Sequence, residues 1–344
     1  MKVGYVYDPV YLKHETGYHP ENAQRLEAII AHLEETKLIE QLTSIKPRPA
    51  TVKEVTYVHQ ASYISRIQDT ALRGGGWLDA DTVMSPDSYD AALYAAGGVI
   101  EATDAVIKGR VNSAFALVRP PGHHATALMA MGFCLFNNIA IATQHALKKH
   151  HMEKVAIIDF DVHHGNGTQE AFSSNPQVLY VSTHQHPHYP GTGNIGETGS
   201  GAAAGSKVNV PLPSGCGDNE YRQVFEQIIV PATRRFRPQL IMVSAGYDAH
   251  WKDRLAMMEV STTGFAEMVR SIKSLADELC GGKIVITLEG GYDLKALATS
   301  VKATFDVLLG KIDIEDPLGQ PERRWATPDI TGLIEAIKET HNIT

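Results

Sequence analysis

The segment Val155–Gly167 reads V-A-I-I-D-F-D-V-H-H-G-N-G and decides both the fold and the chemistry expected of this chain. Its first four residues form an apolar, mostly β-branched run, which is typical of a buried strand. Residues two apart lie on the same face of a strand, so Asp161 and His163 should point at one spot, with Asp159 on their side. A carboxylate and an imidazole that converge at a strand end are typical of a metal site. The alternative is a polar strand end that leads into the next helix.

Strands and helices are expected to alternate on both sides of this segment. Apolar runs predict further strands at residues 2–7, 113–118, 178–183, 207–211, 239–245 and 283–288. Among the helices between them, one should open at His19-Pro20-Glu21 and run to about Leu38, and another should open at Ser85-Pro86 with Ser85 as its N-cap. This alternation predicts an α/β fold with a mostly parallel central sheet and helices on both faces.

Polar side chains follow four of the predicted strands. They are the pair His123-His124, the pair Asp161 and His163, Asp248, and Tyr292. Ligands of open parallel sheets bind outside the carboxyl ends of the strands. Four such ends on one edge of one sheet therefore predict an active site.

The residue types at these strand ends suit hydrolysis assisted by one metal ion. Asp161, His163 and Asp248 supply three ligands and leave one position open, as in catalytic zinc sites, although Fe²⁺ also suits this set. A water bound there becomes nucleophilic near neutral pH, and His123 or His124 can act as its base. Tyr292 can donate a hydrogen bond to a developing oxyanion. The alternatives are a solvated loop for the histidine pair and a packing role for Tyr292.

A two-metal site is the main competing arrangement. Asp248-Ala249-His250 matches part of the arginase motif D-A-H-x-D, but position 252 is lysine. Gly165 likewise stands where a carboxylate for a second metal would be needed. One metal ion is therefore favoured, and His250 is expected in a loop or at the rim.

Composition excludes several classes of protein. The 344 residues carry a formal charge of −8 with scattered Lys and Arg, which argues against nucleic-acid binding. No apolar run approaches the roughly 18 residues of a membrane span, and the N-terminus lacks the apolar region of a signal peptide. Three widely spaced cysteines suggest reduced thiols. We expect a soluble cytoplasmic protein, and the sequence is compatible with a homo-oligomer.

Six ordered motifs resemble those of the histone deacetylase superfamily: R-P-P-G-H-H-A, G-F-C-L-F-N-N, D-F-D-V-H-H-G-N-G-T, P-G-T-G, S-A-G-Y-D-A-H and L-E-G-G-Y. They are most similar to the class II and bacterial branch, which includes acetylpolyamine amidohydrolases and acetoin-utilisation proteins. The resemblance covers about residues 1–310 as one catalytic domain. Residues 311–344 form a tail with a helix near 331–339 that is expected to pack on the domain. An arginase-like α/β fold and zinc-dependent deacylation of an N-acylated amine are implied.

The resemblance also implies a role for individual residues. Asp161, His163 and Asp248 match the zinc ligands, His123 and His124 the catalytic histidines, and Tyr292 the carbonyl-polarising tyrosine. Asp159 and Asn166 lie behind the first and second histidine. The residues implied in substrate binding are Gly132, Phe133, Tyr189, Leu255, Asp81 and Arg25, with Arg25 below the metal. A structural potassium ion is implied at Asp159, Asp161, His163, Ser182 and Thr183, held mostly by carbonyl oxygens.

The chain departs from the family pattern at three places. Asn166 replaces an aspartate, and a neutral amide stabilises imidazolium less than a carboxylate does. Thr126-Ala127 follow H-H-A where many class II members carry glutamate. Leu255 stands where polyamine-selective members place an acidic gatekeeper. The expected substrate is therefore an acyl-lysine peptide or a small acylated amine. An acetylpolyamine amidohydrolase and a catalytically silent acyl-lysine-binding protein are the alternatives.

Overall fold

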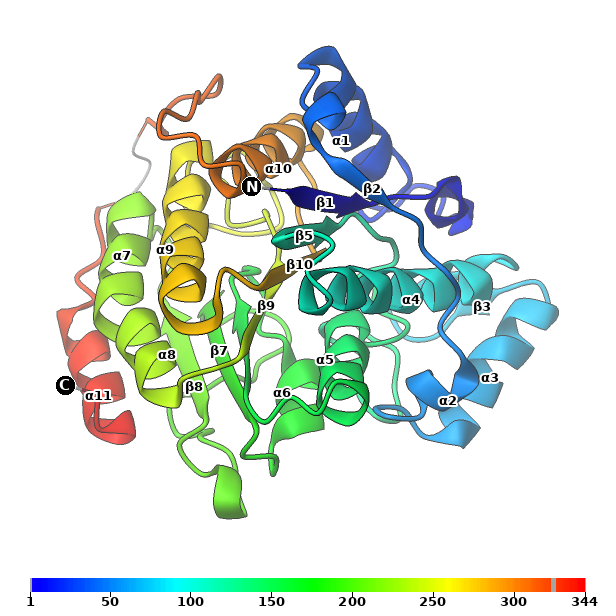
Figure 1. Cartoon of the computed structure of the whole chain (residues 1–344), viewed down its shortest axis with the longest axis horizontal. Coiled ribbons are helices and arrows are strands. Elements are labelled where there is room, and N and C mark those ends of the chain that lie inside the picture. The colour runs from blue at the N-terminus through cyan, green and yellow to red at the C-terminus, as the bar shows by residue number, and fades with distance from the viewer. Residues whose placement is uncertain (1, 323–325, 344) are drawn as a thin grey trace.

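A parallel β-sheet forms the centre of the molecule in the computed structural model (Figure 1), which describes residues 2–322 and 326–343. Met1 of the predicted domain and residues 323–325 and 344 of the predicted tail lie outside the described residues. Within the described residues the sheet has eight strands, in the order β2 (Thr43–Ile45), β1 (Val3–Val6), β5 (Ser113–Ala116), β10 (Ile284–Leu288), β9 (Leu240–Ala245), β6 (Val155–Asp159), β7 (Val178–Gln185) and β8 (Lys207–Leu212).

All pairings in this sheet are parallel. Helices cover both of its faces (Figure 1). One layer contains α1 (Gln24–Glu35), α7 (Asp218–Val224), α8 (Val230–Phe236), α9 (Thr262–Cys280) and α10 (Leu294–Leu308). The other contains α4 (Ser88–Ile107), α5 (Asn138–Lys149) and α6 (Asn166–Phe172). The predicted fold class is confirmed, and burial on both faces explains why the central strands are mostly apolar rather than alternating.

Smaller elements surround this core. Helices α2 (Val52–Val55) and α3 (Ala61–Leu72) pack outside α5 and α4, and β3 (Gly76–Trp77) pairs antiparallel with β4 (Val83–Met84). A π-helical segment, Phe225–Ile229, joins α7 to α8, and α11 (Thr331–His341) packs on that segment and on β8. Short 3₁₀ helices occupy Pro9–Lys13, Ile39–Gln41 and Gly201–Ala203. Among the helices of the described residues, none has the length and apolar character that crossing a bilayer requires.

Two predicted helix starts are wrong. Helix α1 begins at Gln24 rather than His19, because the carboxylate of Glu21 is held by Arg119, 2.5 Å away, and the backbone before it stays irregular. Helix α4 begins at Ser88 with Asp87 at its N-cap position. Ser85 lies in the preceding turn, where its N–H donates to Ser88 Oγ over 2.7 Å.

Candidate active site

Four adjacent strands carry the predicted polar groups to one edge of the sheet. In space β5, β10, β9 and β6 lie side by side, although two of them come from the last third of the chain. The segments that follow them carry the histidine pair, Tyr292, Asp248 and the Asp161–His163 stretch, respectively. Parallel pairing therefore brings together groups that are far apart in sequence.

Two carboxylates and an imidazole meet at the centre of this edge. One ligand atom from each of Asp161, His163 and Asp248 lies within 4.8 Å of the others. His163 Nδ1 is 3.2 Å from Asp161 Oδ1 and 3.1 Å from Asp248 Oδ2. Backbone groups fix both carboxylates, because Gly290 N–H donates to Asp161 Oδ2 and Val162 N–H to Asp248 Oδ1. The three side chains are thus held with their ligand atoms facing one point.

The surroundings of these residues suit a bound dication. Asp161 and Asp248 are almost fully buried, and buried carboxylates need a compensating cation. Burial and the neighbouring Asp161 raise the pKa of Asp248 above its usual value. Gly246 and Gly290 leave the room that the two carboxylates occupy, since a Cβ at either position would collide with them. Two oxygens and one imidazole nitrogen with an open fourth position are the donor set of catalytic zinc sites.

The two adjacent histidines have different partners. His123 Nδ1 lies 3.2 Å from Asp159 Oδ2, which also accepts a hydrogen bond from the Tyr180 hydroxyl over 3.0 Å. His124 Nδ1 lies 2.8 Å from Asn166 Oδ1, and the two imidazole centroids are 4.0 Å apart. One ring therefore faces a carboxylate and the other a neutral amide.

This difference separates the pKa values of the pair. Burial opposes the charge on His123, but the carboxylates of Asp161 and Asp159 outweigh it and raise the pKa to about 10. Burial and the charges of His123 and His163 lower the pKa of His124 well below its usual value. The arrangement thus favours a charged His123 beside a neutral His124.

Glu289 fixes the loop that carries the histidines, a role that the sequence reasoning did not assign. Its Oε2 accepts hydrogen bonds from the backbone N–H groups of Gly122 and His123, over 2.7 and 3.2 Å. Its Oε1 accepts from the Ser244 hydroxyl over 2.9 Å. Burial raises the pKa of Glu289 to about 7. An acid directly after a buried, mostly apolar strand was the signal that could have revealed it.

Arg25 supports Tyr292 from below the cavity rather than lining it. Its Nε donates to the carbonyl of Gly291 over 2.7 Å and its Nη2 to that of Glu289 over 2.6 Å. The guanidinium carbon lies 5.0 Å from the centroid of the Tyr292 ring. Glu21 holds the same guanidinium over 3.1 Å. The fully buried Arg25 therefore positions the backbone and the ring of the Tyr292 segment.

Asp253 is a second residue that sequence reasoning missed. Its Oδ2 accepts hydrogen bonds from the backbone N–H groups of Tyr292 and Asp293, over 2.6 and 3.0 Å. Its Oδ1 accepts from Leu255 N–H over 3.0 Å. Burial and the charge of Asp248 raise its pKa to about 6. An acid five residues after Asp248 was the available signal, but a carboxylate that binds only backbone groups belongs to no side-chain motif.

A narrow cavity of about 200 Å³ leads to these groups from the surface. Phe133 stands edge-on to Tyr292 with ring centroids 5.8 Å apart, and Tyr189 stands edge-on to His124 at 5.2 Å. Gly132 has φ +54°, and a Cβ there would collide with the His124 ring, so glycine is required at this wall. The full lining is Asp81, Pro121, His123, His124, Gly132, Phe133, His163, His188, Tyr189, Leu255, Gly290 and Tyr292.

His250 and two of the residues implied for potassium, Ser182 and Thr183, do not line this cavity. His250 is fully buried rather than at the rim, because α9 covers it and its ring stacks on Phe265 with an interplanar angle of 9°. Ser182 pairs in register with Asp159 across β7 and β6. The buried Thr183 hydroxyl has no hydrogen-bond partner among the described residues.

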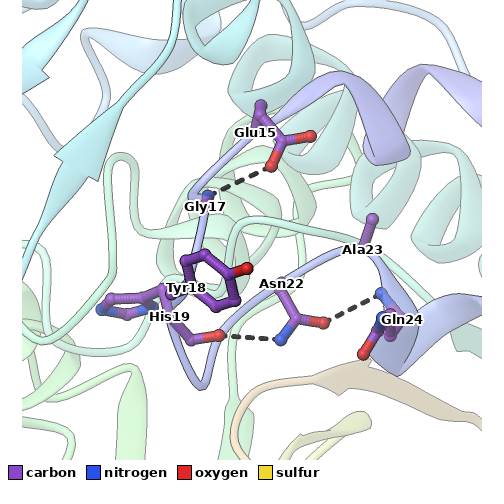
Figure 2. Close-up of a pocket in the computed structure, with 7 residues that line it drawn as sticks. All are labelled: Glu15, Gly17, Tyr18, His19, Asn22, Ala23 and Gln24. Carbon is purple, nitrogen blue, oxygen red and sulfur yellow. Dashed lines mark hydrogen bonds between the residues drawn. The ribbon is translucent and has the colours of Figure 1, made fainter.

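A larger hollow of about 660 Å³ borders the cavity but gathers no comparable chemistry (Figure 2). It is formed by residues 15–24 between the first 3₁₀ helix and α1, and Tyr18 is fully exposed there. His19 separates the two spaces, because its ring packs edge-on against Phe133 at 4.5 Å. The hydrogen bonds that Figure 2 draws join neighbouring residues, such as Asn22 Nδ2 to the carbonyl of His19. The His19 ring also lies within hydrogen-bond distance of the Asp81 carbonyl, at 3.1 Å.

The fold and the groups at its carboxyl edge are those of an α/β hydrolytic enzyme. Residues 19–308 match the model of the histone deacetylase domain. The chain is 40% identical to Histone deacetylase 14, chloroplastic, of Arabidopsis thaliana, covering 96% of this chain and 82% of that protein. It is 39% identical to a probable deacetylase of Archaeoglobus fulgidus, covering 99% and 98%, and 38% identical to the histone deacetylase-like amidohydrolase of Pseudomonas aeruginosa, covering 92% and 82%.

A solved structure agrees with these relatives. The crystal structure of the HDA15 HD domain superposes with a TM-score of 0.88 at 35% identity, covering 98% of this chain and 95% of that one. The chain belongs to the histone deacetylase family, which confirms the resemblance drawn from the motifs. It is therefore a hydrolase of the deacetylase type.

Proposed function

We propose that this protein is a zinc-dependent amidohydrolase that removes an acyl group, such as acetyl, from acyl-lysine or a related acylated amine. The observation that carries the proposal is the convergence of Asp161, His163 and Asp248 beside the histidine pair and Tyr292, at the inner end of a narrow cavity. Residues 1–310 would form the catalytic domain, and residues 311–344 the C-terminal tail.

Asp161, His163 and Asp248 would hold one Zn²⁺, and Fe²⁺ also suits this set of ligands. When bound, the dication polarises the acyl carbonyl and makes a coordinated water acidic. We also propose a structural K⁺ held by Asp159, Asp161, His163, Ser182 and Thr183. The in-register pairing of Ser182 with Asp159 across β7 and β6 supports that second site.

The protein side chains divide the proton transfers between them. His124, which stays neutral, accepts the proton of the attacking water as its oxygen bonds to the carbonyl carbon. His123, which Asp159 and Asp161 keep charged, donates a proton to the leaving nitrogen as the C–N bond breaks. The Tyr292 hydroxyl donates a hydrogen bond to the carbonyl oxygen while that oxygen carries negative charge. Transfer of the acid proton to the released amine then gives a carboxylate and an ammonium ion.

The cavity wall favours a straight apolar stem over a charged one. Phe133 and Tyr189 supply aromatic sides, and Leu255 adds no charge near the mouth. Asp81 lines the cavity and would accept hydrogen bonds from the backbone of a peptide substrate. We therefore propose acyl-lysine peptides as better substrates than acetylpolyamines. An at least tenfold higher kcat/KM for acetylspermidine than for an acetyl-lysine peptide would reverse this order.

One assay separates catalysis from silent binding of acyl-lysine. The purified chain should release acetate from a fluorogenic acetyl-lysine peptide, lose that activity with a chelator, and regain it when Zn²⁺ is returned. Binding of the peptide without turnover, at any zinc concentration, would instead identify an acyl-lysine-binding protein.

A further inference from the structure

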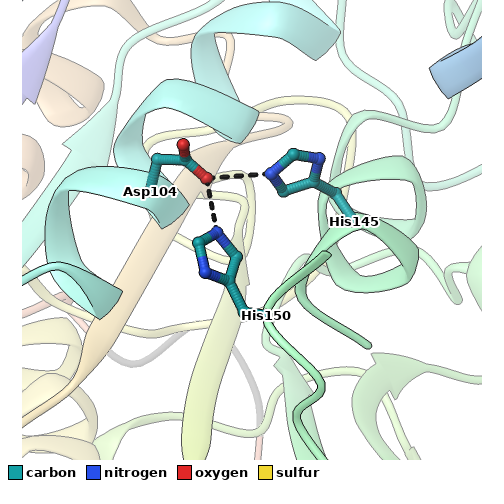
Figure 3. A group of neighbouring side chains, drawn as sticks. All are labelled: Asp104, His145 and His150. Atoms are coloured by element: carbon teal, nitrogen blue, oxygen red, sulfur yellow. Dashed lines mark hydrogen bonds and ion pairs between the residues drawn. The ribbon is translucent and has the colours of Figure 1, made fainter. Parts of the chain in front are cut away.

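We propose that Asp104, His145 and His150 form a second metal site, for Zn²⁺, between helices α4 and α5. The site belongs to neither the cavity nor the proposed deacylation. Its ligand atoms lie within 4.8 Å of one another, as do those of the active-site group. Figure 3 shows both imidazole rings directed at the same carboxylate of Asp104.

The geometry supplies two nitrogens and one oxygen at a single point. His145 Nε2 and His150 Nε2 lie 2.8 and 2.7 Å from Asp104 Oδ1. Two imidazoles and a carboxylate are common zinc ligands. Zn²⁺ would replace the protons through which the two Nε2 atoms now bind Oδ1. Because ligand bonds to zinc are about 2.0–2.2 Å long, Oδ1 and the two Nε2 atoms would move roughly half an ångström apart. Asp104 and His150 are partly exposed, which leaves an entry path and room for water as the fourth ligand.

A carboxylate stands behind His145, as is usual for histidines that bind metal. His145 Nδ1 lies 3.7 Å from Glu54 Oε1 and has no hydrogen-bond partner among the described residues, although the residue is only 6% exposed. Arg48 holds the Glu54 carboxylate in place through two hydrogen bonds of 2.8 and 2.7 Å. A proton on Nδ1 facing Glu54 leaves the lone pair of Nε2 free for a cation.

The two helix ends add negative potential at this point. Asp104 lies in the last turn of α4, His150 is the C-cap residue of α5, and His145 lies just before the last turn of α5. The carbonyl ends of helices favour nearby cations. Lys108 already contacts Asp104, but it binds the other carboxylate oxygen, Oδ2, and so leaves Oδ1 available. Burial opposes the charge on Asp104, yet hydrogen bonds from Lys108, His150 and His145 keep its pKa well below the usual value.

The test counts metal in the intact chain. Wild type, His150→Gln, Asp104→Asn and the control His151→Gln are dialysed against micromolar Zn²⁺ and then measured by mass spectrometry for zinc per chain. His151 is the exposed neighbour of His150 and is not part of the cluster. We expect wild type and control to bind one equivalent more than either cluster variant, and the thermal midpoint to rise with added zinc only where that equivalent binds.

The result does not depend on the proposed deacylation. All variants share the same active site, so a difference of one equivalent of zinc per chain reports only on the Asp104, His145 and His150 cluster. His150→Gln should keep kcat/KM within about twofold, since the cluster does not touch the cavity. If His150→Gln does not fold, Asp104→Asn alone makes the comparison. Equal zinc content in wild type and the folded cluster variants would overturn the proposal. Co²⁺ spectra of the additional equivalent should show the absorption of a four-coordinate ion with nitrogen ligands, and their absence would likewise refute it.

Discussion

Replacing Asp253 with asparagine should lower turnover by roughly tenfold to a hundredfold and leave KM nearly unchanged. The Asp253 carboxylate accepts backbone N–H groups from Leu255, Tyr292 and Asp293. Asparagine has one accepting oxygen, and its NH₂ group would face N–H donors that it cannot bind. If the amide oxygen takes the place of Oδ2, the Tyr292 segment keeps its two hydrogen bonds but loses the charged acceptor, and Leu255 N–H loses its acceptor altogether. A hydrogen bond to a charged group is worth about 1.5–3 kcal/mol. At about 1.4 kcal/mol per tenfold this gives the stated range.

The assay compares kcat and KM for an acetyl-lysine peptide in four chains: wild type, Asp253→Asn, Tyr292→Phe and the double variant. If Asp253 acts by positioning the Tyr292 hydroxyl, its replacement should change kcat little once that hydroxyl is gone. Asp218→Asn is the matched control. The Asp218 carboxylate also accepts a backbone hydrogen bond, from Ser261 N–H at 2.8 Å, but Asp218 does not line the cavity. An equal loss of kcat from Asp253→Asn with and without the Tyr292 hydroxyl would refute this reasoning.

Four further changes test the proposed site and its support. Asp161→Ala should lose zinc and activity together, and full zinc content with full activity would remove it from the ligand set. Tyr292→Phe should keep zinc but lower kcat by roughly 10²–10³; wild-type turnover would make it a packing residue. Asn166→Asp should raise the pKa of His124, which burial lowers, and move the acid limb of kcat/KM upward by about one pH unit. An unmoved limb in the pH–rate profile would contradict His124 as the base. Burial opposes the charge of Glu21, but two arginines lower its pKa to about 2. Glu21→Gln should therefore unfold at lower urea than wild type at pH 7, and this difference should shrink as pH falls below about 4.5; a gap independent of pH would contradict it.

The groups at the strand ends could be predicted because the residues next to each of them in sequence indicate a strand end. An apolar run followed by unusual polar residues identifies a strand end. Parallel pairing then brings the carboxyl ends of the strands to one edge of the sheet. Asp161, Asp248 and Tyr292 were found in this way. The spatial order of the strands could not be predicted, because no residue near β10 in the sequence indicates that it lies between β5 and β9.

The supporting residues escaped prediction because their partners are distant or are backbone groups. Glu289 and Asp253 accept N–H groups, and every residue except proline offers one. The start of α1 shifted because Glu21 binds Arg119, which is 98 positions away. The helix signal at His19-Pro20-Glu21 was real, but it could not include that ion pair. Local rules fail at these places because tertiary contacts compete with them.

The central position of β10 has a consequence for biosynthesis. β5 and β9 both pair with β10, which is synthesised after them, so neither can complete its ladder until β10 has left the ribosome. A nascent chain that stops near Cys280 would leave one edge of β5 and one edge of β9 unpaired, and unpaired strand edges invite pairing with other chains. Fragments truncated before Ile284 should therefore aggregate rather than accumulate as soluble intermediates. The enzyme should depend on chaperones until its last strand is inserted.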